Sequence, residues 1–185
     1  DPNYVNGYNN RGYAKNNLED YQGAIEDYTK AIEIDPDYAD AYYNRGFSRG
    51  NLEDDQGAIE DFTKSIDLNP NDASAYYNRG ISKDNLEDYQ GAIEDFTKAI
   101  DLDPEKVGAF INRGFSKGNL EDYQGAIEDY TKAIDLKPDF ADSYYNRGIA
   151  KDNLEDYQGA IEDFTKAIDL KPDFADSYHN RGISK

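Results

Sequence analysis

The sequence contains no cysteine, no methionine and no tryptophan, and it has a single histidine. Without cysteine, disulfides and thiolate metal sites are excluded. No apolar run approaches the roughly 20 residues that a membrane-spanning helix needs, so we expect no transmembrane segment. Positive charge is scarce as well, because 20 Lys and Arg oppose 39 Asp and Glu, for a formal net charge of -19 at pH 7. This charge disfavours nucleic acid and anionic membranes as ligands and favours a neutral or basic partner.

What the sequence does contain is a repeat of 34 residues, marked by the tripeptide Asn-Arg-Gly at residues 10, 44, 78, 112, 146 and 180. A unit of this size cannot bury its own apolar face, so stability requires stacking of neighbouring units. The full repeats are residues 5–38, 39–72, 73–106, 107–140 and 141–174. Residues 1–4 have the pattern of the end of a preceding repeat, and residues 175–185 begin a sixth. We expect one array without a domain boundary, excised from a longer one.

Each repeat is predicted to hold two helices. In the first repeat they cover residues 6–18 and 21–34, with Asp20 placed to cap the second helix and Pro36 following its end. Apolar residues recur in the second helix at the three- and four-residue spacing of a helix face. These predicted core residues are Ala24, Ile25, Tyr28, Ala31 and Ile32. Small residues such as Gly12 and Ala24 allow the two helices to approach closely.

Further positions recur with the same period: an aromatic at the fourth, Gly at the eighth, Ala at the twentieth, Tyr or Phe at the twenty-fourth, Ala or Ser at the twenty-seventh and Pro at the thirty-second. The aromatic residues at the fourth position are Tyr8, Tyr42, Tyr76, Phe110 and Tyr144. This pattern resembles the tetratricopeptide repeat and covers essentially the whole chain. The resemblance implies an all-α fold, a right-handed superhelical solenoid of antiparallel helix pairs. In such a solenoid the first helices line a concave groove and the second helices form the convex side.

The chain departs from the family pattern at the seventh and eleventh positions, where charged residues replace the usual Leu and Tyr. The cationic pairs are Arg11 with Lys15, Arg45 with Arg49, Arg79 with Lys83, Arg113 with Lys117 and Arg147 with Lys151. Burying an unpaired cation costs several kcal/mol, so we predict ion pairs with the acidic couple of the second helix. These couples are Glu26-Asp27, Glu60-Asp61, Glu94-Asp95, Glu128-Asp129 and Glu162-Asp163. The alternative is that the cations extend to water on their aliphatic stems.

Asparagine forms a ladder along the predicted first helices, at the sixth and thirteenth positions of the repeats. The predicted groove amides are Asn10, Asn17, Asn44, Asn51, Asn78, Asn85, Asn112, Asn119, Asn146, Asn153 and Asn180. The predicted aromatic groove residues beside them are Tyr43, Phe47, Tyr77, Phe115 and Tyr145. An amide offers both a donor and an acceptor, so it can hold a peptide main chain whatever its side chains. We therefore predict a noncatalytic scaffold that binds an extended protein segment in this groove.

Other interpretations of the ladder and of the array remain open. Asn at the sixth position is frequent in the family and can serve contacts between helices instead. A similar ladder holds the peptide main chain in the tetratricopeptide-repeat glycosyltransferases that modify protein serines, but no transferase domain is present. The carboxylate-clamp subgroup fits poorly, because Asp40, Tyr43 and Asn44 stand where it has basic residues. A separate possibility is head-to-tail self-association through the open ends of the array.

No catalytic, metal or cofactor site is predicted. His179 has no matching His or Cys and stands where Tyr43 and Tyr145 stand in other repeats. The acidic stretch from Asp84 fails the EF-hand pattern, because Tyr89 occupies the place of the required Gly. No nucleophile, base and orienting group recur together. The related RNA-binding helical repeats have a different period and a basic surface, neither of which is present here.

Overall fold

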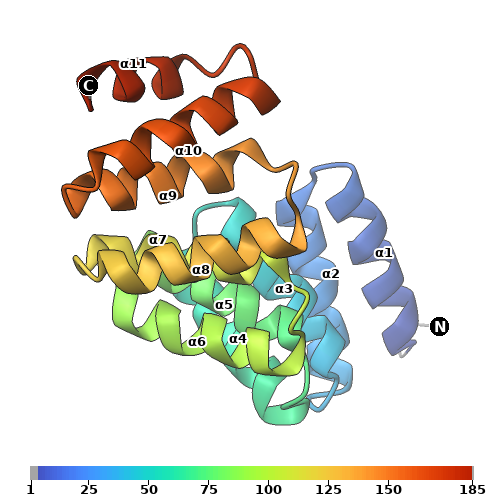
Figure 1. Cartoon of the computed structure of the whole chain (residues 1–185). Helices are drawn as coiled ribbons and strands as arrows, with labels where there is room; N and C mark the ends of the chain where they lie inside the picture. Colours follow the sequence, from blue (N-terminus) through green and yellow to red (C-terminus); the bar gives the residue numbers. More distant parts are fainter. Residues whose placement is uncertain (1–3, 185) are drawn as a thin grey trace. The chain divides into compact units, whose positions relative to one another are not determined.

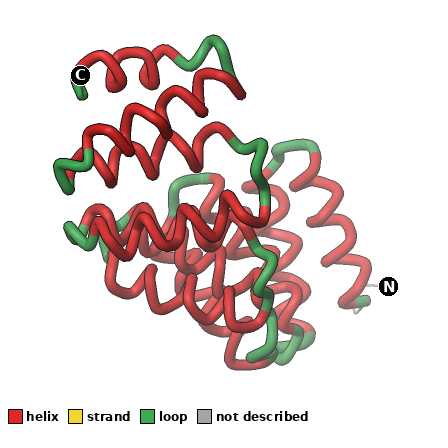
Figure 2. The backbone as a smooth tube through the Cα atoms, viewed as in Figure 1, coloured by secondary structure: helices red, strands yellow, loops and turns green. Residues whose placement is uncertain are grey.

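The computed structural model describes residues 4–184, which form eleven α-helices and no strand (Figures 1 and 2). The chain divides into two compact units, Asp1–Leu102 and Asp103–Lys185. The first unit holds α1 (Val5–Asn17), α2 (Tyr21–Ile34), α3 (Ala39–Asn51), α4 (Asp55–Leu68), α5 (Ala73–Asn85) and α6 (Tyr89–Leu102). The second unit holds α7 (Val107–Asn119), α8 (Tyr123–Leu136), α9 (Ala141–Asn153), α10 (Tyr157–Leu170) and α11 (Ala175–Ile183). Each odd-numbered helix up to α9 packs on the next helix as an antiparallel pair (Figure 1).

The all-α prediction is confirmed. That the repeats form one array without a domain boundary stays a prediction. The two compact units divide after Leu102, at the end of the last helix of the third repeat. The residue before the first helix varies between repeats: Lys106 precedes α7 and Asp72 precedes α5, whereas aromatic residues precede α3, α9 and α11. The sequence period is uninterrupted at the division.

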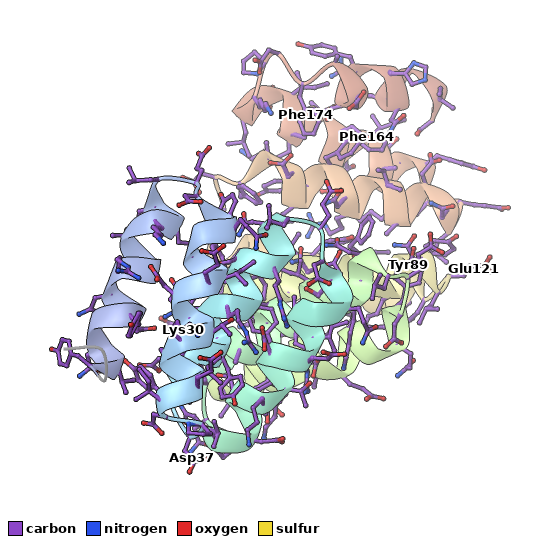
Figure 3. All side chains as sticks on the ribbon, turned by 180° about the vertical axis from the view of Figure 1, so that it is seen from behind. Lys30, Asp37, Tyr89, Glu121, Phe164 and Phe174 are labelled. Carbon is purple, nitrogen blue, oxygen red and sulfur yellow. The ribbon has the colours of Figure 1, made fainter. Side chains whose placement is uncertain are left out.

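The first helix of each repeat ends in a tight turn that depends on a residue with positive φ. In the first turn this residue is Glu19, with φ 61°. Its N–H donates to the Asn16 carbonyl at 3.0 Å, and the Asp20 N–H donates to the Lys15 carbonyl at 3.0 Å. This bond pattern is the Schellman motif, in which Gly usually occupies the left-handed position. The other left-handed residues are Glu53, Glu87, Glu121 and Glu155, and Glu121 lies at the outer edge of its turn (Figure 3).

An aspartate caps the second helix of each repeat, as predicted. The Asp20 carboxylate accepts a hydrogen bond from the Gly23 N–H at 3.0 Å, which satisfies one of the free donors at the helix start. The equivalent caps are Asp54, Asp88, Asp122 and Asp156. The predicted first helix is displaced by one residue, since α1 covers Val5–Asn17, whereas α2 has the predicted bounds.

The core of each repeat lies between its two helices. Ala24, Tyr28 and Ala31 are wholly buried, as predicted, whereas Ile25 and Ile32 are only half-buried. The rings equivalent to Tyr28 are Phe62, Phe96, Tyr130 and Phe164. Each of these rings packs on the Gly at the eighth position of its repeat, and a Cβ added at Gly80 would lie 2.7 Å from the Phe96 ring. Close approach of the two helices therefore requires glycine at this position.

Three buried hydroxyl groups lack a hydrogen-bond partner within the described part of the core. One is the Tyr28 hydroxyl, and burial raises the pKa of this group to about 12. The others are Ser143 Oγ and Ser177 Oγ, on the wholly buried third position of their repeats, where Ala41, Ala75 and Ala109 stand in earlier repeats. An unsatisfied buried hydroxyl destabilises a fold, so these three positions are local weak points of the packing.

Candidate binding groove

The predicted ion pairs form, and they connect the first helix of each repeat to its second helix. Arg79 donates from Nε and Nη2 to the two oxygens of Asp95, at 2.8 and 2.6 Å. Lys83 Nζ lies 2.7 Å from the same carboxylate, which is 5% exposed. Glu94 is exposed and takes no part. The prediction that the cations pair with the acidic couple is therefore confirmed for the aspartate and wrong for the glutamate.

The same arrangement recurs with Asp27, Asp61, Asp129 and Asp163, each between the cations of its own repeat. The hydrogen bond from Arg11 lowers the pKa of Asp27 below its ordinary value. The arginine also reaches the repeat before it, as in the bond from Arg79 Nη1 to Thr63 Oγ1 at 3.0 Å. The cations thus hold together both the helix pair and the neighbouring repeat.

The amides at the sixth position of the repeat make contacts between repeats. Asn78 Nδ2 donates to the Tyr43 hydroxyl at 3.0 Å, and Asn180 Nδ2 donates to the Tyr145 hydroxyl at 3.3 Å. These bonds agree with the alternative in which Asn serves contacts between helices. They use one N–H of each amide, which also carries a second N–H and an oxygen.

Asn146 differs from these two amides. The residue opposite it in the preceding repeat is Ile111, which offers no hydrogen-bond acceptor on its side chain. Within the described chain, Asn146 has no hydrogen-bond partner for its amide, and it lines a pocket on its unit. It is therefore the amide of the ladder best placed to bind a ligand.

The amides at the thirteenth position bond mainly to their own helices. Asn51 Nδ2 donates to the Phe47 carbonyl at 2.8 Å, and Asn119 and Asn153 make the same bond to the residue four positions earlier. Asn85 is the exception, because its Nδ2 donates to Asp55 Oδ1 at 3.2 Å. Each of these bonds uses one N–H of the amide, so a second N–H and the oxygen remain for a ligand.

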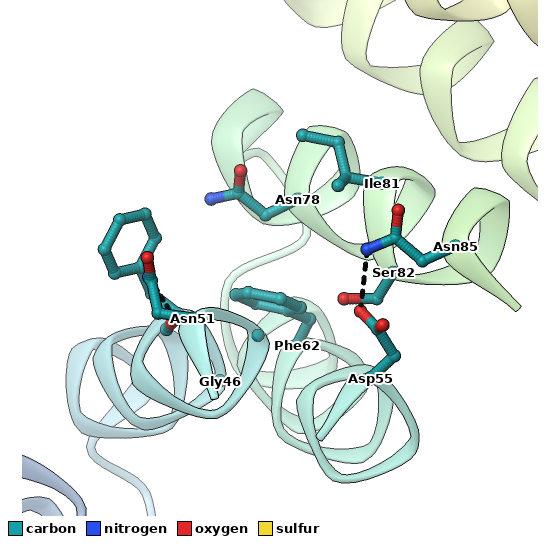
Figure 4. Close-up of a pocket in the computed structure, with 10 residues that line it drawn as sticks. Gly46, Asn51, Asp55, Phe62, Asn78, Ile81, Ser82 and Asn85 are labelled. Atoms are coloured by element: carbon teal, nitrogen blue, oxygen red, sulfur yellow. Dashed lines mark hydrogen bonds between the residues drawn. The ribbon is translucent and has the colours of Figure 1, made fainter. Parts of the chain in front are cut away.

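Three equivalent pockets lie between the first helices of neighbouring repeats. In the first unit a pocket of about 200 Å³ lies between α3 and α5, with Phe62 of α4 as its floor (Figure 4). In the second unit a pocket of about 270 Å³ lies between α7 and α9, over Tyr130, and another of about 180 Å³ lies between α9 and α11, over Phe164. The pockets bring together part of the predicted site: Phe47, Asn51, Asn78 and Asn85 in one, Phe115, Asn119, Asn146 and Asn153 in the next, and Asn153 with Asn180 in the third.

The predicted aromatic residues divide into two groups. Phe47 and Phe115 are 41% and 50% exposed, so their rings are available at the pocket walls. Tyr43 and Tyr145 instead pack on the core, with ring centroids 5.8 and 5.9 Å from Phe62 and Phe164. Burial raises the pKa of both tyrosines. Tyr77 packs in the same way on Phe96, and these three tyrosines line none of the three pockets.

The remaining predicted amides lie outside the three pockets. Asn10 and Asn17 are exposed on α1, Asn44 donates to Asn9 Oδ1 at 3.1 Å, and Asn112 lies on α7. The pockets also contain residues that the sequence analysis did not select. Asp55 and Tyr123 hold the first position of α4 and α8 and face the pockets from the second helix. The sequence did mark Asp55, because the other full repeats have Tyr at this position.

The pockets combine amides, aromatic walls and apolar floors. Among residues 4–184, no group of acidic and histidine side chains has the arrangement of a metal site. No helix within these residues has the length and hydropathy needed to cross a membrane. The fold and the pockets define a helical-repeat protein with pockets between neighbouring first helices in each unit.

Comparison with known proteins identifies the family. The tetratricopeptide repeat model matches residues 39–72, 73–106 and 141–174, and a TPR repeat model matches residues 16–53 and 115–151. The chain therefore belongs to the tetratricopeptide repeat family, and it is a scaffold of the kind that mediates protein interactions. No curated protein matches its sequence.

Solved structures agree with this assignment. A crystal structure of MamA has a TM-score of 0.86 and 27% identity, over 93% of this chain and 94% of that one. YrrB, described as a TPR protein with an unusual peptide-binding site, has a TM-score of 0.86 and 25% identity, over 95% of this chain and 90% of that one. MamA from Desulfovibrio magneticus RS-1 has a TM-score of 0.87 and 23% identity, over 92% and 97% of the two chains, and supports the fold alone.

Proposed function

We propose that the protein is a noncatalytic scaffold that binds an extended peptide segment along the face formed by the first helices. The observation that carries the proposal is the set of three equivalent pockets between neighbouring first helices. In the second unit, an extended chain can place side chains in the two successive pockets while amides hold its main chain. The similarity to YrrB, a protein described as having a peptide-binding site, supports the same function.

Asn146 is the amide through which the proposal is best tested, because its side chain has no competing bond within the described chain. A displayed library of random peptides would be selected on the immobilised protein, and recovered peptides measured by fluorescence polarisation. Replacing Asn146 and Phe115 with Ala is expected to weaken binding about tenfold or more, since a hydrogen bond and an aromatic contact are lost together. Asn71→Ala, at an exposed turn outside the pockets, is the matched control.

Equal retention of the recovered peptides by the wild type and the Asn146 and Phe115 variant would remove this pocket from the mechanism. Circular dichroism of each variant separates lost binding from lost folding. Since Asn146 and Phe115 are half-buried and exposed respectively, we expect both substitutions to leave the helical spectrum intact.

Self-association through the open face of α11 is a second candidate. Tyr178 and Ile183 are 46% and 67% exposed on this helix. A Cβ added at Gly182 would meet no atom within 4 Å, whereas the equivalent Gly148 faces the ring of Phe164. This open face is the one that a second helix covers in every complete repeat. We favour peptide binding, because equivalent pockets between first helices recur in both units.

Light scattering over a wide concentration range distinguishes the two candidates. We expect a constant monomer mass for both the full chain and a variant truncated after Phe174. A mass that grows with concentration in the full chain alone would instead make α11 an assembly surface.

A further inference from the structure

The pocket between α3 and α5 differs in charge from the equivalent pocket between α7 and α9. Asp55 begins α4, at the seventeenth position of its repeat. Tyrosine occupies this position in the other full repeats, as Tyr21, Tyr89, Tyr123 and Tyr157. Asp55 therefore marks the second repeat as chemically distinct on its groove side, while the capping role at the helix start belongs to its neighbour Asp54.

The Asp55 carboxylate lies at the wall of an otherwise uncharged pocket (Figure 4). Of the described residues that line this pocket, Asp55 alone is ionisable; Phe47, Phe62 and Ile81 supply apolar surface. Asp55 Oδ1 accepts one hydrogen bond, from Asn85 Nδ2 at 3.2 Å. No Lys or Arg of residues 4–184 forms a salt bridge with it, although Arg49 nearby pairs with Asp54 and Asp61. A carboxylate has about four acceptor sites, so most of its capacity is unused.

The equivalent pocket of the second unit provides a direct comparison. Tyr123 holds the place of Asp55 there, and no charged residue lines the pocket. The two pockets otherwise share their plan, with Phe115 in place of Phe47 and Tyr130 in place of Phe62. Between these two pockets, the seventeenth position of the repeat thus decides whether the pocket carries a negative charge. The pocket between α9 and α11 has its acidic residue, Asp152, at the twelfth position instead.

We infer that the Asp55 pocket binds a lysine or arginine side chain of a peptide, and that the Tyr123 pocket binds an apolar side chain. This inference rests on the proposed peptide-binding function. The methylene stem of a basic side chain fits against Phe47 and Phe62, and its charged head reaches the Asp55 carboxylate. The exposed ring of Phe47 adds a favourable cation–π contact. Pairing would use a carboxylate that has no cationic partner in the described chain.

Asp55 also has a structural alternative, because an acidic residue in the first turn of a helix interacts favourably with the helix dipole. That role would affect the stability of α4, but it would not make binding depend on the charge of a peptide side chain. A comparison of matched peptides therefore separates the two roles.

The test uses fluorescein-labelled nonapeptides of alternating Ser and Thr, with blocked ends and a single central Lys or norleucine. Fluorescence polarisation gives the affinity ratio of the two peptides. For the wild type we expect the Lys peptide to bind about tenfold more tightly, the effect of one charge-assisted hydrogen bond at a half-exposed site. Asp55→Asn is expected to abolish the preference, and Asp55→Tyr, which installs the residue of the other repeats, to reverse it.

Two further variants control for the net charge of the protein. Asp101→Asn removes one exposed carboxylate of α6 outside the pockets and is expected to keep the preference. Tyr123→Asp is expected to increase it by creating a second charged pocket. An Asp55→Asn protein that keeps the wild-type preference would overturn the inference while leaving peptide binding intact. If neither peptide, nor any library peptide, binds the wild type, both the inference and the proposed function fail.

Discussion

The substitution Asp95→Asn tests the ion pairs that hold the repeats together. The Asp95 carboxylate accepts two hydrogen bonds from Arg79, at 2.8 and 2.6 Å, and lies 2.7 Å from Lys83 Nζ. Asparagine has nearly the same shape, but it carries no charge and turns an N–H toward one of the cations. The substitution therefore removes the charge of the pair without opening a cavity.

The expected cost follows from the burial of the three groups. Asp95 is 5% exposed, and the side chains of Arg79 and Lys83 are 16% and 19% exposed. Burial alone would lower the pKa of Arg79, but its hydrogen bond and charge interaction with Asp95 raise this pKa above its ordinary value. Removing one member of a buried pair costs about 3–5 kcal/mol. Because both cations retain some access to water, we expect Asp95→Asn to lower the free energy of unfolding by about 3 kcal/mol.

Urea unfolding followed by far-ultraviolet circular dichroism measures this loss. Since repeat arrays unfold through partly folded states, the transition midpoints are compared together with their slopes. Glu94→Gln is the matched control: Glu94 is the adjacent, exposed member of the acidic couple, and its substitution should change stability by less than about 0.5 kcal/mol. A loss at Asp95 below about 1 kcal/mol, or equal to the loss at Glu94, would refute the assignment of the ion pair.

Three further substitutions test local features of the packing. Glu87→Gly should raise the unfolding free energy by about 1 kcal/mol, measured by urea unfolding, because Gly accepts the positive φ of 62° without strain; no gain would contradict the strain argument. Ser143→Ala should raise the melting temperature, by an amount equivalent to about 1 kcal/mol, since it removes an unsatisfied buried hydroxyl; a lower melting temperature would mean that the hydroxyl has a partner. Gly148→Ala should cost about 1–3 kcal/mol because its Cβ would lie 2.7 Å from the Phe164 ring, whereas Gly182→Ala, which meets nothing within 4 Å, should cost nothing; similar thermal shifts for both would contradict the close-packing argument.

The sequence predicted the helices well because their signals are local. The caps at Asp20 and its equivalents follow from side-chain chemistry and from the phase of the helix, and these caps form in the structure. Helix phase could also have decided which acid of each couple is buried. Asp27 lies three residues after Ala24 and four before Ala31, on the buried face, whereas Glu26 lies one residue off that face.

Other features could not be predicted from residue type. Glutamate has no preference for positive φ, so nothing in the composition of the Leu18-Glu19-Asp20 turn identifies Glu19 as left-handed. The bond from Asn78 to the Tyr43 hydroxyl depends on how neighbouring repeats are placed, which the period alone does not specify. For the same reason, the sequence could not decide whether an asparagine of the ladder contacts a neighbouring repeat or a ligand. Both roles use the same side-chain amide.

Comparison of the internal repeats separates the residues that stabilise the fold from the residues available for contact with a ligand. Each full repeat keeps the Arg and Asp pair, in which the two side chains contact each other, and the glycine that faces the buried ring. The groove side varies instead, as with Phe47, Ile81 and Phe115 at the ninth position of successive repeats. Exchanging such residues between repeats changes neither helix pairing nor the ion pairs. Selectivity for a peptide can therefore arise pocket by pocket on a scaffold whose stability is set elsewhere in the same helices.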